Sequence, residues 1–432
     1  MAKRIAYIHP SFYVPYIFES AERNDVEFVV ILPPGEVVQN EYPCVTAYET
    51  LPLYTDPEAA HHGIAELHAR WQFDGIMTIK ESCMVWTAEA AGRLGLPGID
   101  PEAAKAARDK GTMRQRFKQA GLVTPKFAVI SGMAEIELCR EMAFPFIVKP
   151  ASGYNSDGVQ LVANQDELEK AIQVVERLNA DIYHKVSWHD GQNFSNVVVE
   201  EFIEGGEYVV ELFALDGNVV ALNCGYKGHP AGPYFEETVY LSPPALPQEK
   251  IREIQSAAIG GMRALGLQNG PGHCELRLNH LGQPVILEIG ARIGGSGCAH
   301  FNVEGSTDID FSNLWFSYLT GAPKSSYWPP IASNTGKAAS SWILPLGGNG
   351  LLHSIDGLDQ VRQHPDCERV LMFAQIGKHY RPYPNFDGFL AIVFGQHAST
   401  QAGEEFFDFL ERTLKVNWDP APAVQPTELA EA

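Results

Sequence analysis

Short apolar runs alternate with helical stretches over residues 1–105, and this alternation constrains the fold more than any other feature of the chain. Runs rich in Ile and Val fall at 5–8, 26–32 and 75–79, and helical patterns fall at 57–71 and 87–94. Parallel strands need a crossover between them, usually a helix. The alternation therefore predicts a parallel sheet with helices on its faces. A glycine-rich dinucleotide fingerprint does not follow the first run, so a hydride-transferring enzyme has little support.

A second pattern begins near residue 106 and mixes helices with hairpins. Helices are predicted over 110–120 and 165–178, and strands over 146–149, 159–162, 197–201, 208–215 and 218–222. Asp216-Gly217 joins the last two strands and is a strong hairpin signal. A third pattern of short strands begins near residue 322 and closes with a helix over 403–414. A chain of 432 residues with these patterns is expected to have more than one core.

Charge and cysteine content narrow the partners and the compartment. The net charge of −21 repels nucleic-acid backbones and anionic membrane surfaces, so neither is expected as a partner. No apolar stretch approaches the ~18 residues that a membrane-spanning helix needs. The seven cysteines are scattered and never spaced C-x-x-C, which argues against a disulfide framework or a zinc–thiolate site. A soluble, cytoplasmic protein is expected.

The segment 272–292 is the most informative, and it reads as a hairpin that turns around Leu281 and Gly282. In an antiparallel pair of strands, the residue numbers of every two facing residues add up to the same total. A turn around Leu281 and Gly282 allows a register in which Glu275 faces Glu288. Side chains alternate between faces, so both glutamates would stand together on one side. The same register predicts two apolar pairs on the other side: Leu276 with Leu287, and Leu278 with Val285.

Two carboxylates directly opposite each other repel unless a cation lies between them. A divalent metal that carries ATP phosphates fits this position, because magnesium is held by one or two carboxylates together with phosphate oxygens. Arg292 follows Glu288 by four residues and can meet a carboxylate or phosphate with its planar guanidinium. The alternative is a solvated hairpin face whose glutamates point into water.

Two further segments carry charged residues at strand ends. Lys149 ends a buried strand, and the loop 151–158 that follows offers glycine, serine and several backbone donors, which suit an anion. The run Glu200-Glu201 ends another strand, and Glu207 follows a glycine turn, where a carboxylate could accept from ribose hydroxyls. Each segment alone is more typical of an ordinary solvated turn. A Walker loop and kinase signatures are absent.

In order along the chain, these residues resemble the ATP-grasp superfamily over nearly the whole sequence: Asp109-Lys110, Val148-Lys149-Pro150, Glu200-Glu201 with Glu207, Glu275, and Glu288 with Arg292. The long third region and the run 291–296, Ala-Arg-Ile-Gly-Gly-Ser, look most like bacterial L-amino acid ligases, which are dipeptide synthetases. The resemblance implies an α/β and α+β fold. It consists of an N-terminal Rossmann-like parallel-sheet domain, two α+β ATP-binding lobes and a C-terminal α+β domain.

Domain boundaries follow from the resemblance together with the change of pattern along the chain. We expect the N-terminal domain over 1–105 and the ATP-grasp domain over 106–321. Within the latter, the small lobe spans about 125–200 and the large lobe about 201–321. The C-terminal domain is expected over 322–420, and 421–432, rich in proline and acidic residues, reads as a disordered tail.

The resemblance also implies a role for each matching residue. The ATP-binding set comprises the phosphate lysines, the flexible loop, the adenine-contacting linker and the ribose glutamate: Lys110, Lys149, Ser156, Gly158, Glu200, Glu201, Phe202 and Glu207. The metal ligands are Glu275 and Glu288, and Arg292 would stabilise the phosphorylated intermediate. The expected cofactors are ATP and Mg²⁺, with Mn²⁺ as an alternative metal. Gly290 stands where many superfamily members have an asparagine that binds metal. The resemblance therefore leaves open whether the site holds one metal ion or two.

Residues near the substrate are expected in two places. Gly294, Gly295 and Ser296 are small and should leave room for a medium or large apolar first amino acid. His229, Glu236 and His273 lie in segments that face the substrate in this superfamily, although residues of this kind are more often structural than substrate-binding. His273 shares a strand face with Glu275, so it is expected to point toward the site.

The predicted activity is ATP-dependent joining of two L-amino acids through an acyl phosphate, with release of ADP and phosphate. Amino acids are the expected substrates, and a homodimer is common in this group. Two alternatives stay open. One is another ATP-grasp ligase or carboxylase that acts on a non-amino-acid carboxylate, and the other is a non-catalytic nucleotide-binding protein.

Overall fold

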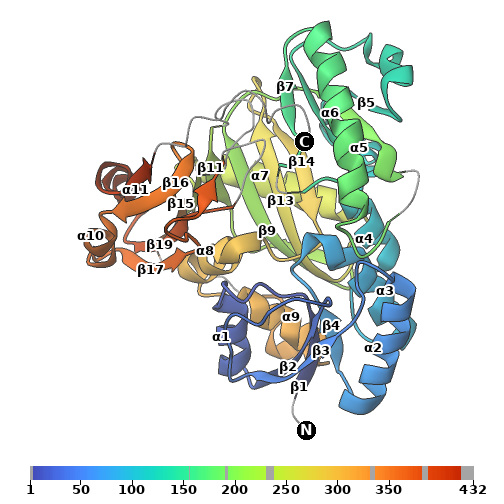
Figure 1. Ribbon diagram of the computed structural model, residues 1–432, viewed down its shortest axis with the longest axis vertical. Helices are drawn as coiled ribbons and strands as arrows, with labels where there is room; N and C mark the ends of the chain where they lie inside the picture. The colour runs from blue at the N-terminus through green and yellow to red at the C-terminus, as the bar shows by residue number, and fades with distance from the viewer. Residues whose placement is uncertain are drawn as a thin grey trace.

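The computed structural model describes residues 3–154, 156–189, 193–229, 238–330, 336–381 and 388–419. Within these ranges lie a four-stranded parallel sheet, a four-stranded antiparallel sheet, a large sheet of nine strands and a small sheet of three. Figure 1 shows the N-terminal elements at the bottom, the antiparallel sheet with its long helix at the top, and the C-terminal elements at the left of the large sheet.

The N-terminal sheet is parallel and has the strand order β3–β2–β1–β4. Its elements are β1 (Lys3–Ile8), α1 (Tyr16–Arg23), β2 (Val26–Leu32), β3 (Val45–Thr50), α2 (Pro57–Trp71), β4 (Gly75–Met77) and α3 (Met84–Leu94). Strand β2 is buried along almost its whole length, as expected for a strand covered on both faces. The predicted parallel sheet is confirmed, and β2 and α2 have the predicted bounds.

A second sheet is antiparallel and has the order β5–β8–β6–β7. Its elements are α4 (Pro101–Arg108), α5 (Lys110–Gln119), β5 (Phe127–Ile130), β6 (Phe146–Pro150), β7 (Gln160–Val162), α6 (Gln165–Tyr183) and β8 (Val197–Glu201). Helix α6 is capped at its N-terminus by Asn164, whose side chain accepts from the Glu167 backbone N–H. Its apolar stripe, including Leu168, Ile172 and Val175, packs against the sheet, as the spacing predicts.

The large sheet has the order β14–β13–β9–β11–β12–β15–β19–β17, with β10 paired to β9. Its first part consists of β9 (Glu207–Leu215), β10 (Asn218–Ala221), β11 (Gly225–Gly228), β12 (Val239–Ser242), β13 (Gly270–Leu278) and β14 (Pro284–Gly290), with helix α7 (Gln248–Ala264) packed on it. The predicted turn at Asp216-Gly217 joins β9 and β10, and both of its residues have positive φ.

The C-terminal region continues the large sheet. Strand β12 pairs with β15, with Val239 opposite Trp342 and Leu241 opposite Ser340. The remaining elements are α8 (Cys298–Thr307), α9 (Phe311–Leu319), β15 (Ala338–Ile343), β16 (Gly350–Asp356), α10 (Leu358–Arg362), β17 (Cys367–Met372), β18 (His379–Tyr380), β19 (Ala391–His397), α11 (Thr400–Thr413) and β20 (Lys415–Asp419). Strands β18, β16 and β20 form the small sheet. No signal in the sequence indicates the pairing of β12 with β15.

The hairpin β13–β14 is confirmed, but two of its three predicted facing pairs are wrong. Glu275 lies opposite Glu288, as predicted. Beyond this pair the register shifts, so that Leu276 lies opposite Ile286 and Leu278 opposite Pro284. The predicted pairs with Leu287 and Val285 are therefore not formed, because β14 contains one extra residue there. This β-bulge turns Leu287 toward the same cavity as both glutamates.

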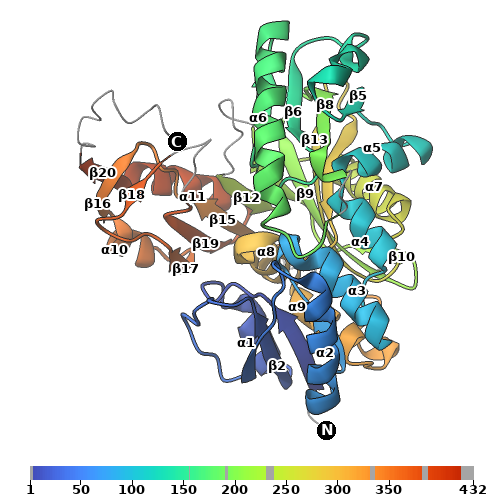
Figure 2. The same ribbon diagram turned by 45° about the vertical axis from the view of Figure 1, so that its right-hand side comes forward.

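Helix α9 joins the N-terminal sheet to the large sheet. Its buried Phe311, Trp315 and Phe316 share one core with Phe28 of β2 and Phe213 of β9. The rings of Phe28 and Phe316 lie edge to face, with centroids 5.7 Å apart. Figure 2 shows α9 behind the N-terminal elements, below the large sheet. The carboxyl end of β4 lies next to the large sheet, because Glu81 in the turn after β4 pairs with Arg292, which follows β14. Ligands of open α/β sheets bind at this edge.

Candidate functional site

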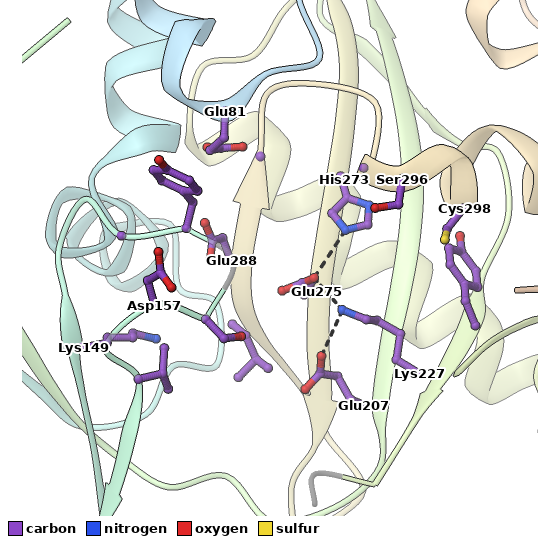
Figure 3. Close-up of a pocket in the computed structure, with 18 of the residues that line it drawn as sticks. Glu81, Lys149, Asp157, Glu207, Lys227, His273, Glu275, Glu288, Ser296 and Cys298 are labelled. Atoms are coloured by element: carbon purple, nitrogen blue, oxygen red, sulfur yellow. Dashed lines mark hydrogen bonds and ion pairs between the residues drawn. The ribbon is translucent and has the colours of Figure 1, made fainter. Parts of the chain in front are cut away.

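A cavity of about 260 Å³ lies between the antiparallel second sheet and the large sheet. Lys149 of β6 and Glu200 of β8 line one side, and Glu275 and Glu288 of the hairpin line the other. The N-terminal region contributes Glu81, which belongs to a short 3₁₀ turn, η1 (Glu81–Cys83), after β4. Figure 3 shows Glu81, Lys149, Glu275 and Glu288 converging on one space from different parts of the chain. Most of the predicted site residues therefore meet here.

Each of the facing glutamates is paired with a lysine. The Glu275 carboxylate accepts from Lys227 Nζ at 2.6 Å, and the Glu288 carboxylate accepts from Lys110 Nζ at 3.1 Å. Burial alone would raise the pKa of Glu275, but the charges of Lys227 and His273 outweigh burial and hold it well below its usual range. Lysine pairing thus offsets the repulsion between two carboxylates that face each other across the hairpin.

Lys110 joins the hairpin to the loop after β6. It is the first residue of α5, and its ammonium also donates to the Gly153 carbonyl at 2.7 Å. Its backbone N–H donates to the Ala151 carbonyl at 2.9 Å. The helix begins here because the Asp109 side chain accepts from the Thr112 backbone N–H at 2.6 Å. Lys110 is only 5% exposed, so its charge is fixed inside the cavity.

Lys149 and Glu200 form a buried ion pair across β6 and β8. Arg114 of α5 donates to the same carboxylate from Nε at 2.8 Å and from Nη2 at 3.2 Å. It also donates to the Leu287 carbonyl. Burial alone would raise the pKa of Glu200, but Arg114 and Lys149 lower it to about 2. Burial lowers the pKa of Lys149 to about 8, although Glu200 opposes this shift. Glu200 is thus an ionised anchor for Lys149.

The loop after β6 reaches the cavity through Ser156 and Asp157. Gly158 lies beside them without lining the cavity, and its φ of 75° is one that side-chain-bearing residues rarely adopt. A Cβ atom at Gly158 would lie 2.8 Å from Leu178 Cδ1, so glycine is also needed for space. The predicted loop therefore has glycine where the backbone requires it.

Glu207 starts β9 and faces the cavity, where it contacts two cations. Arg277 Nε donates to one of its carboxylate oxygens at 3.0 Å, and Lys227 Nζ lies 3.3 Å from the other. Arg277 also lies over the Phe202 ring, 5.4 Å from its centroid. Glu201 lies outside the cavity lining and forms an ion pair with Lys126 at 3.5 Å. Lys227 consequently links the predicted ribose residue, Glu207, to the predicted metal ligand, Glu275.

Arg292 comes directly after the hairpin and contacts Glu81 through Nε. The exposed fractions of the two side chains are 18% and 8%, so this ion pair is largely buried. Gly290 lies beside the same pair: a Cβ atom there would be 3.5 Å from a Glu81 carboxylate oxygen and 3.6 Å from Arg292 Cγ. The space next to Gly290 is therefore bordered by Glu81 and Arg292.

His273 points into the cavity, as its strand face predicts. Its Nδ1 lies 2.7 Å from the fully buried Glu211 carboxylate, and its Nε2 lies 3.4 Å from the Glu275 carboxylate. Burial opposes protonation, but Glu211 and Glu275 outweigh it and raise the pKa of His273 to about 9. A Cβ atom at Gly294 would lie 2.5 Å from His273 Nδ1. Gly294 thus makes room for the imidazole ring.

Of the remaining predicted substrate residues, some line the cavity and others do not. Gly295 and Ser296 line the cavity, and Ser296 has a φ of 57°. Figure 3 shows Ser296 beside the His273 ring. His229 is exposed, lies outside the cavity lining and hydrogen-bonds the Tyr226 hydroxyl through Nδ1 at 2.6 Å. Glu236 lies outside the described residues.

Sequence reasoning missed four charged residues that complete the site: Glu81, Arg114, Lys227 and Arg277. Arg277 could have been found, because it lies two residues after Glu275 and so shares its strand face. Glu81, Arg114 and Lys227 reach the site from other elements. Their positions depend on how the sheets pack, which local patterns do not reveal.

The donor set fits a magnesium ion that arrives with phosphates. No group of three or more His, Cys, Asp or Glu side chains that could hold a metal by themselves occurs in the part of the chain that the structure describes. Glu275 and Glu288 supply two carboxylates on one face of the hairpin, with lysines next to both. Mg²⁺ is typically bound by one or two carboxylates, with the remaining ligands from phosphates and water.

Comparisons with known proteins agree with this geometry. The family model of the ATP-grasp N-terminal domain matches residues 18–98, and that of the ATP-grasp domain matches residues 142–300. A third family model, L-amino acid ligase C-terminal domain 2, matches residues 342–419. Together these matches fall on the N-terminal sheet, the two sheets around the cavity, and the C-terminal region.

Alanine–anticapsin ligase of Bacillus subtilis is 29% identical over 236 residues, 51% of this chain and 49% of that protein. Carnosine synthase 1 of Gallus gallus is 29% identical over 261 residues, 57% of this chain and 27% of that protein. The matches thus span less than two thirds of either curated relative. The crystal structure of an L-amino acid ligase from Bacillus licheniformis is 33% identical, with a TM-score of 0.86, and covers 97% of this chain and 99% of that one. The chain therefore belongs to the ATP-grasp superfamily and, within it, to the L-amino acid ligase family.

Proposed function

We propose that the protein is an ATP-dependent ligase that joins the carboxylate of one L-amino acid to the amine of another, releasing ADP and phosphate. The observation that carries the proposal is the facing pair Glu275 and Glu288, each next to a lysine, in a cavity that Arg292 also borders. Family membership supplies the reaction class, because the L-amino acid ligase of Bacillus licheniformis shares the whole fold.

The residues around the cavity suit the parts of ATP. Lys110 and Lys149 offer two fixed charges to the phosphates, and the loop at Ser156 lies next to them. Glu207 at the start of β9 is placed for the ribose hydroxyls. Glu275 and Glu288 would hold Mg²⁺, or Mn²⁺, which supplies charge neutralisation to the phosphates when bound.

The proposed reaction has two steps. An oxygen of the first amino acid's carboxylate attacks the γ-phosphorus, and ADP leaves, which gives an acyl phosphate. The amine nitrogen of the second amino acid then attacks the acyl carbon, and phosphate leaves with the electron pair of the broken C–O bond. Arg292 stabilises the negative charge that develops in each step. Positioning of the reactants in such a site is worth roughly 7–11 kcal/mol of the barrier.

The first amino acid is proposed to have a medium or large apolar side chain. Val239, Ile343, Phe389 and Cys298 also line the cavity, and they give part of its wall an apolar character. Val239 and Ile343 lie on the neighbouring strands β12 and β15, so the C-terminal region forms part of this wall. An apolar side chain would gain about 25 cal/mol for each Å² that it buries there.

A matrix of amino acid pairs tests the proposal directly. ATP-dependent phosphate release is measured for every pair, with each amino acid alone and bicarbonate as controls, and mass spectrometry identifies the products. We expect phosphate release to require a pair and to match the amount of dipeptide formed. Release with bicarbonate but with no pair would instead indicate a carboxylase, and ATP binding without turnover would indicate a non-catalytic protein.

We also propose a cytoplasmic location and a homodimeric assembly. None of the described helices is long and apolar enough to cross a membrane. Sedimentation equilibrium gives the assembly state, for which a dimer is expected. Cell fractionation tests the location, and recovery in the membrane fraction would contradict it.

A further inference from the structure

A fully buried carboxylate, Glu211, lies next to the cavity-lining His273 and takes no part in the steps proposed above. It belongs to β9 and is paired with His273 of β13 across the large sheet. Its side chain is 0% exposed, and its oxygen Oε2 has no hydrogen-bond partner among the described residues. Burial of a charged group is costly unless the group is paired. The contacts of the other oxygen should therefore explain why a carboxylate is present here.

Oxygen Oε1 of Glu211 contacts groups from two other strands. It lies 2.7 Å from His273 Nδ1 on β13, and it accepts from the Tyr240 hydroxyl on β12 at 3.2 Å. Asn223 Nδ2 donates to the same hydroxyl at 3.2 Å, and Asn223 Oδ1 accepts from the Glu211 backbone N–H at 3.3 Å. The carboxylate is thus held in place, so that it can in turn hold the imidazole ring.

The His273 ring has little space in which to turn. A Cβ atom at Gly294 would lie 2.5 Å from its Nδ1 and 2.8 Å from its Cε1, so the turn after β14 packs directly on the ring. On the other side, Nε2 lies 3.4 Å from Oε1 of Glu275. Figure 3 shows His273 above Glu275, with a dashed line between them. An ionised carboxylate can only accept hydrogen bonds, so each ring nitrogen donates to its own carboxylate.

Two donors orient the Glu275 carboxylate by contacting the same oxygen. Lys227 Nζ donates to Oε1 at 2.6 Å, and His273 Nε2 lies 3.4 Å from the same atom. Both donors therefore hold Oε1, and Oε2 is the oxygen that is proposed to bind the metal. Removal of a partner that orients a metal ligand typically weakens metal binding about 10- to 100-fold.

We propose that Glu211 is a positioning residue of the metal site, which holds the His273 ring so that Nε2 donates to the Glu275 carboxylate. This inference rests on the proposed function, in which Glu275 binds the metal ion. Glu211 acts through His273 and does not contact the ion. A carboxylate that only supported the sheet would affect stability and leave the affinity for metal unchanged.

Calorimetric titration with ADP measures the contribution of the metal without turnover. The dissociation constant of ADP is measured in EDTA and again with Mg²⁺, and the first constant divided by the second gives the metal ratio. Glu211→Met removes the acceptor for His273 and should lower the metal ratio at least tenfold. The dissociation constant in EDTA should stay within threefold of wild type, because Glu211 is absent from the cavity lining.

Two conservative variants separate the contact from the charge. Glu211→Gln keeps an oxygen that can accept from His273 Nδ1 but loses the charge, so its metal ratio should stay within threefold of wild type. Glu211→Asp keeps the charge but is one methylene shorter, so its carboxylate withdraws from the ring and the metal ratio should fall as in Glu211→Met. Glu211→Asp also replaces Glu211→Met in the test if the latter does not fold.

His273→Asn tests whether Glu211 acts through the ring. The shorter amide can still donate to Glu211 but does not reach Glu275, so the metal ratio should fall by a similar factor. In the double variant, Glu211→Met should cause no further fall, because the group through which it acts is already gone. Effects that multiply in the double variant would show that Glu211 acts by another route and would overturn the inference.

Asp366→Asn is the matched control. Asp366 Oδ2 lies 2.9 Å from Nδ1 of the buried His397, and Ser340 Oγ lies 2.8 Å from Nε2 of the same ring. None of these three residues lines the cavity. The variant should therefore lower the temperature of thermal unfolding without changing the metal ratio.

Three results would overturn the inference. They are a wild-type metal ratio in folded Glu211→Met or Glu211→Asp, a loss in Glu211→Gln as large as that in Glu211→Met, and an equal loss in Asp366→Asn. Failure of the proposed function has a different signature. If ADP binding by the wild-type chain does not depend on Mg²⁺, or if Glu288→Gln leaves the metal ratio unchanged, the metal assignment itself is refuted.

Discussion

At the scale of single residues, the site depends on opposite charges that are fixed in pairs. Glu275 and Glu288 would repel each other, and Lys227 and Lys110 offset that repulsion. Glu200 holds Lys149 in the same way on the other side of the cavity. If the proposed function holds, the lysines are in place for phosphates before a nucleotide binds, which reduces the reorganisation that phosphoryl transfer requires.

Glu288→Gln should abolish turnover, with kcat at least 100-fold lower, because one of the two proposed metal carboxylates is removed. The free energy of unfolding should change by only about 1 kcal/mol, since the lost ion pair with Lys110 is partly exposed and the repulsion by Glu275 is relieved. Steady-state kinetics and urea unfolding measure the two effects. Glu253→Gln, on the surface of α7, is the control. Wild-type activity of the Glu288 variant would refute the metal assignment.

The pKa of Lys149 predicts a pH dependence of nucleotide binding. Burial lowers this pKa to about 8 in the folded chain, so the charge that attracts phosphate is present below pH 8 and lost as the pH rises above it. KM for ATP should therefore increase between pH 7.5 and pH 9.5. Lys149→Arg keeps its charge over this range and should show a flat profile. Equal profiles for both chains would rule out Lys149 as the titrating group.

The lowered pKa of Lys149 also makes the free energy of unfolding depend on pH. The unfolded chain binds the Lys149 proton more tightly than the folded chain, so burial of this ammonium destabilises the fold below pH 8. The penalty is relieved as the pH rises from about 8 toward the usual value of 10.5. Wild type should therefore gain stability relative to Lys149→Met over this interval.

Ser296→Trp should narrow the set of accepted first amino acids. Ser296 lines the cavity, and an indole ring there would occupy space proposed for the substrate side chain. We expect large apolar substrates to lose at least tenfold in kcat/KM and small ones to be retained. Unchanged selectivity in the pair screen would show that the first side chain lies elsewhere.

At the scale of secondary-structure elements, the turn after β14 and the strand β13 must fit each other closely. His273 on β13 lies beneath Gly294, where a Cβ atom would be 2.5 Å away from the ring. At Gly295, the next residue, a Cβ atom would meet nothing within 4 Å. These two glycines therefore differ sharply in their tolerance to the same methyl group.

Gly294→Ala should displace His273 and destabilise the chain by about 1–3 kcal/mol, the usual cost of overpacking. Gly295→Ala should leave stability within about 0.5 kcal/mol of wild type. Thermal unfolding of both variants, with kinetics of the folded fraction, gives the comparison. Equal destabilisation would show that the ring has room to move.

Sequence patterns predicted the elements whose signals are local. Strand β2, helix α2 and the turn at Asp216-Gly217 follow directly from apolar runs, capping and turn residues. The antiparallel register of the predicted hairpin correctly placed Glu275 opposite Glu288. The bulge at Leu287 was not predicted, because an extra residue in one strand leaves no local signature. Lys227 and Glu81 were missed for another reason: they reach the cavity from elements that meet only when the sheets pack.

At the scale of the whole molecule, one sheet extends from the cavity into the C-terminal region. Pairing between β12 and β15 joins the hairpin side of the sheet to β19 and β17. The core of the C-terminal region includes Val239 from β12 packed against buried residues such as Trp342 and Leu390. The sequence gives no sign of this continuity, since strand order depends on long-range pairing.

A chain that ends at residue 330 should therefore fail to fold into a soluble unit. It would expose the edge of β12 and one wall of the cavity, and exposed strand edges promote aggregation. Size-exclusion chromatography of residues 1–330 is expected to show aggregates, with partial recovery when residues 331–432 are co-expressed. A soluble, monodisperse and ATP-hydrolysing truncated chain would contradict this expectation.

The continuity of β12 with β15 also has a consequence for how ligases of this kind can diversify. Strand β15 carries the cavity-lining Ile343 and belongs to a region with its own core. That region is expected to be exchangeable between relatives as a unit if the pairing of Val239 with Trp342 is preserved. Under the proposed function, recombination between β12 and β15 is expected to alter the choice of amino acid and to leave the proposed ATP-binding residues unchanged. The connection between β12 and β15 is thus a suitable position at which to join parts of related ligases into a chimeric enzyme.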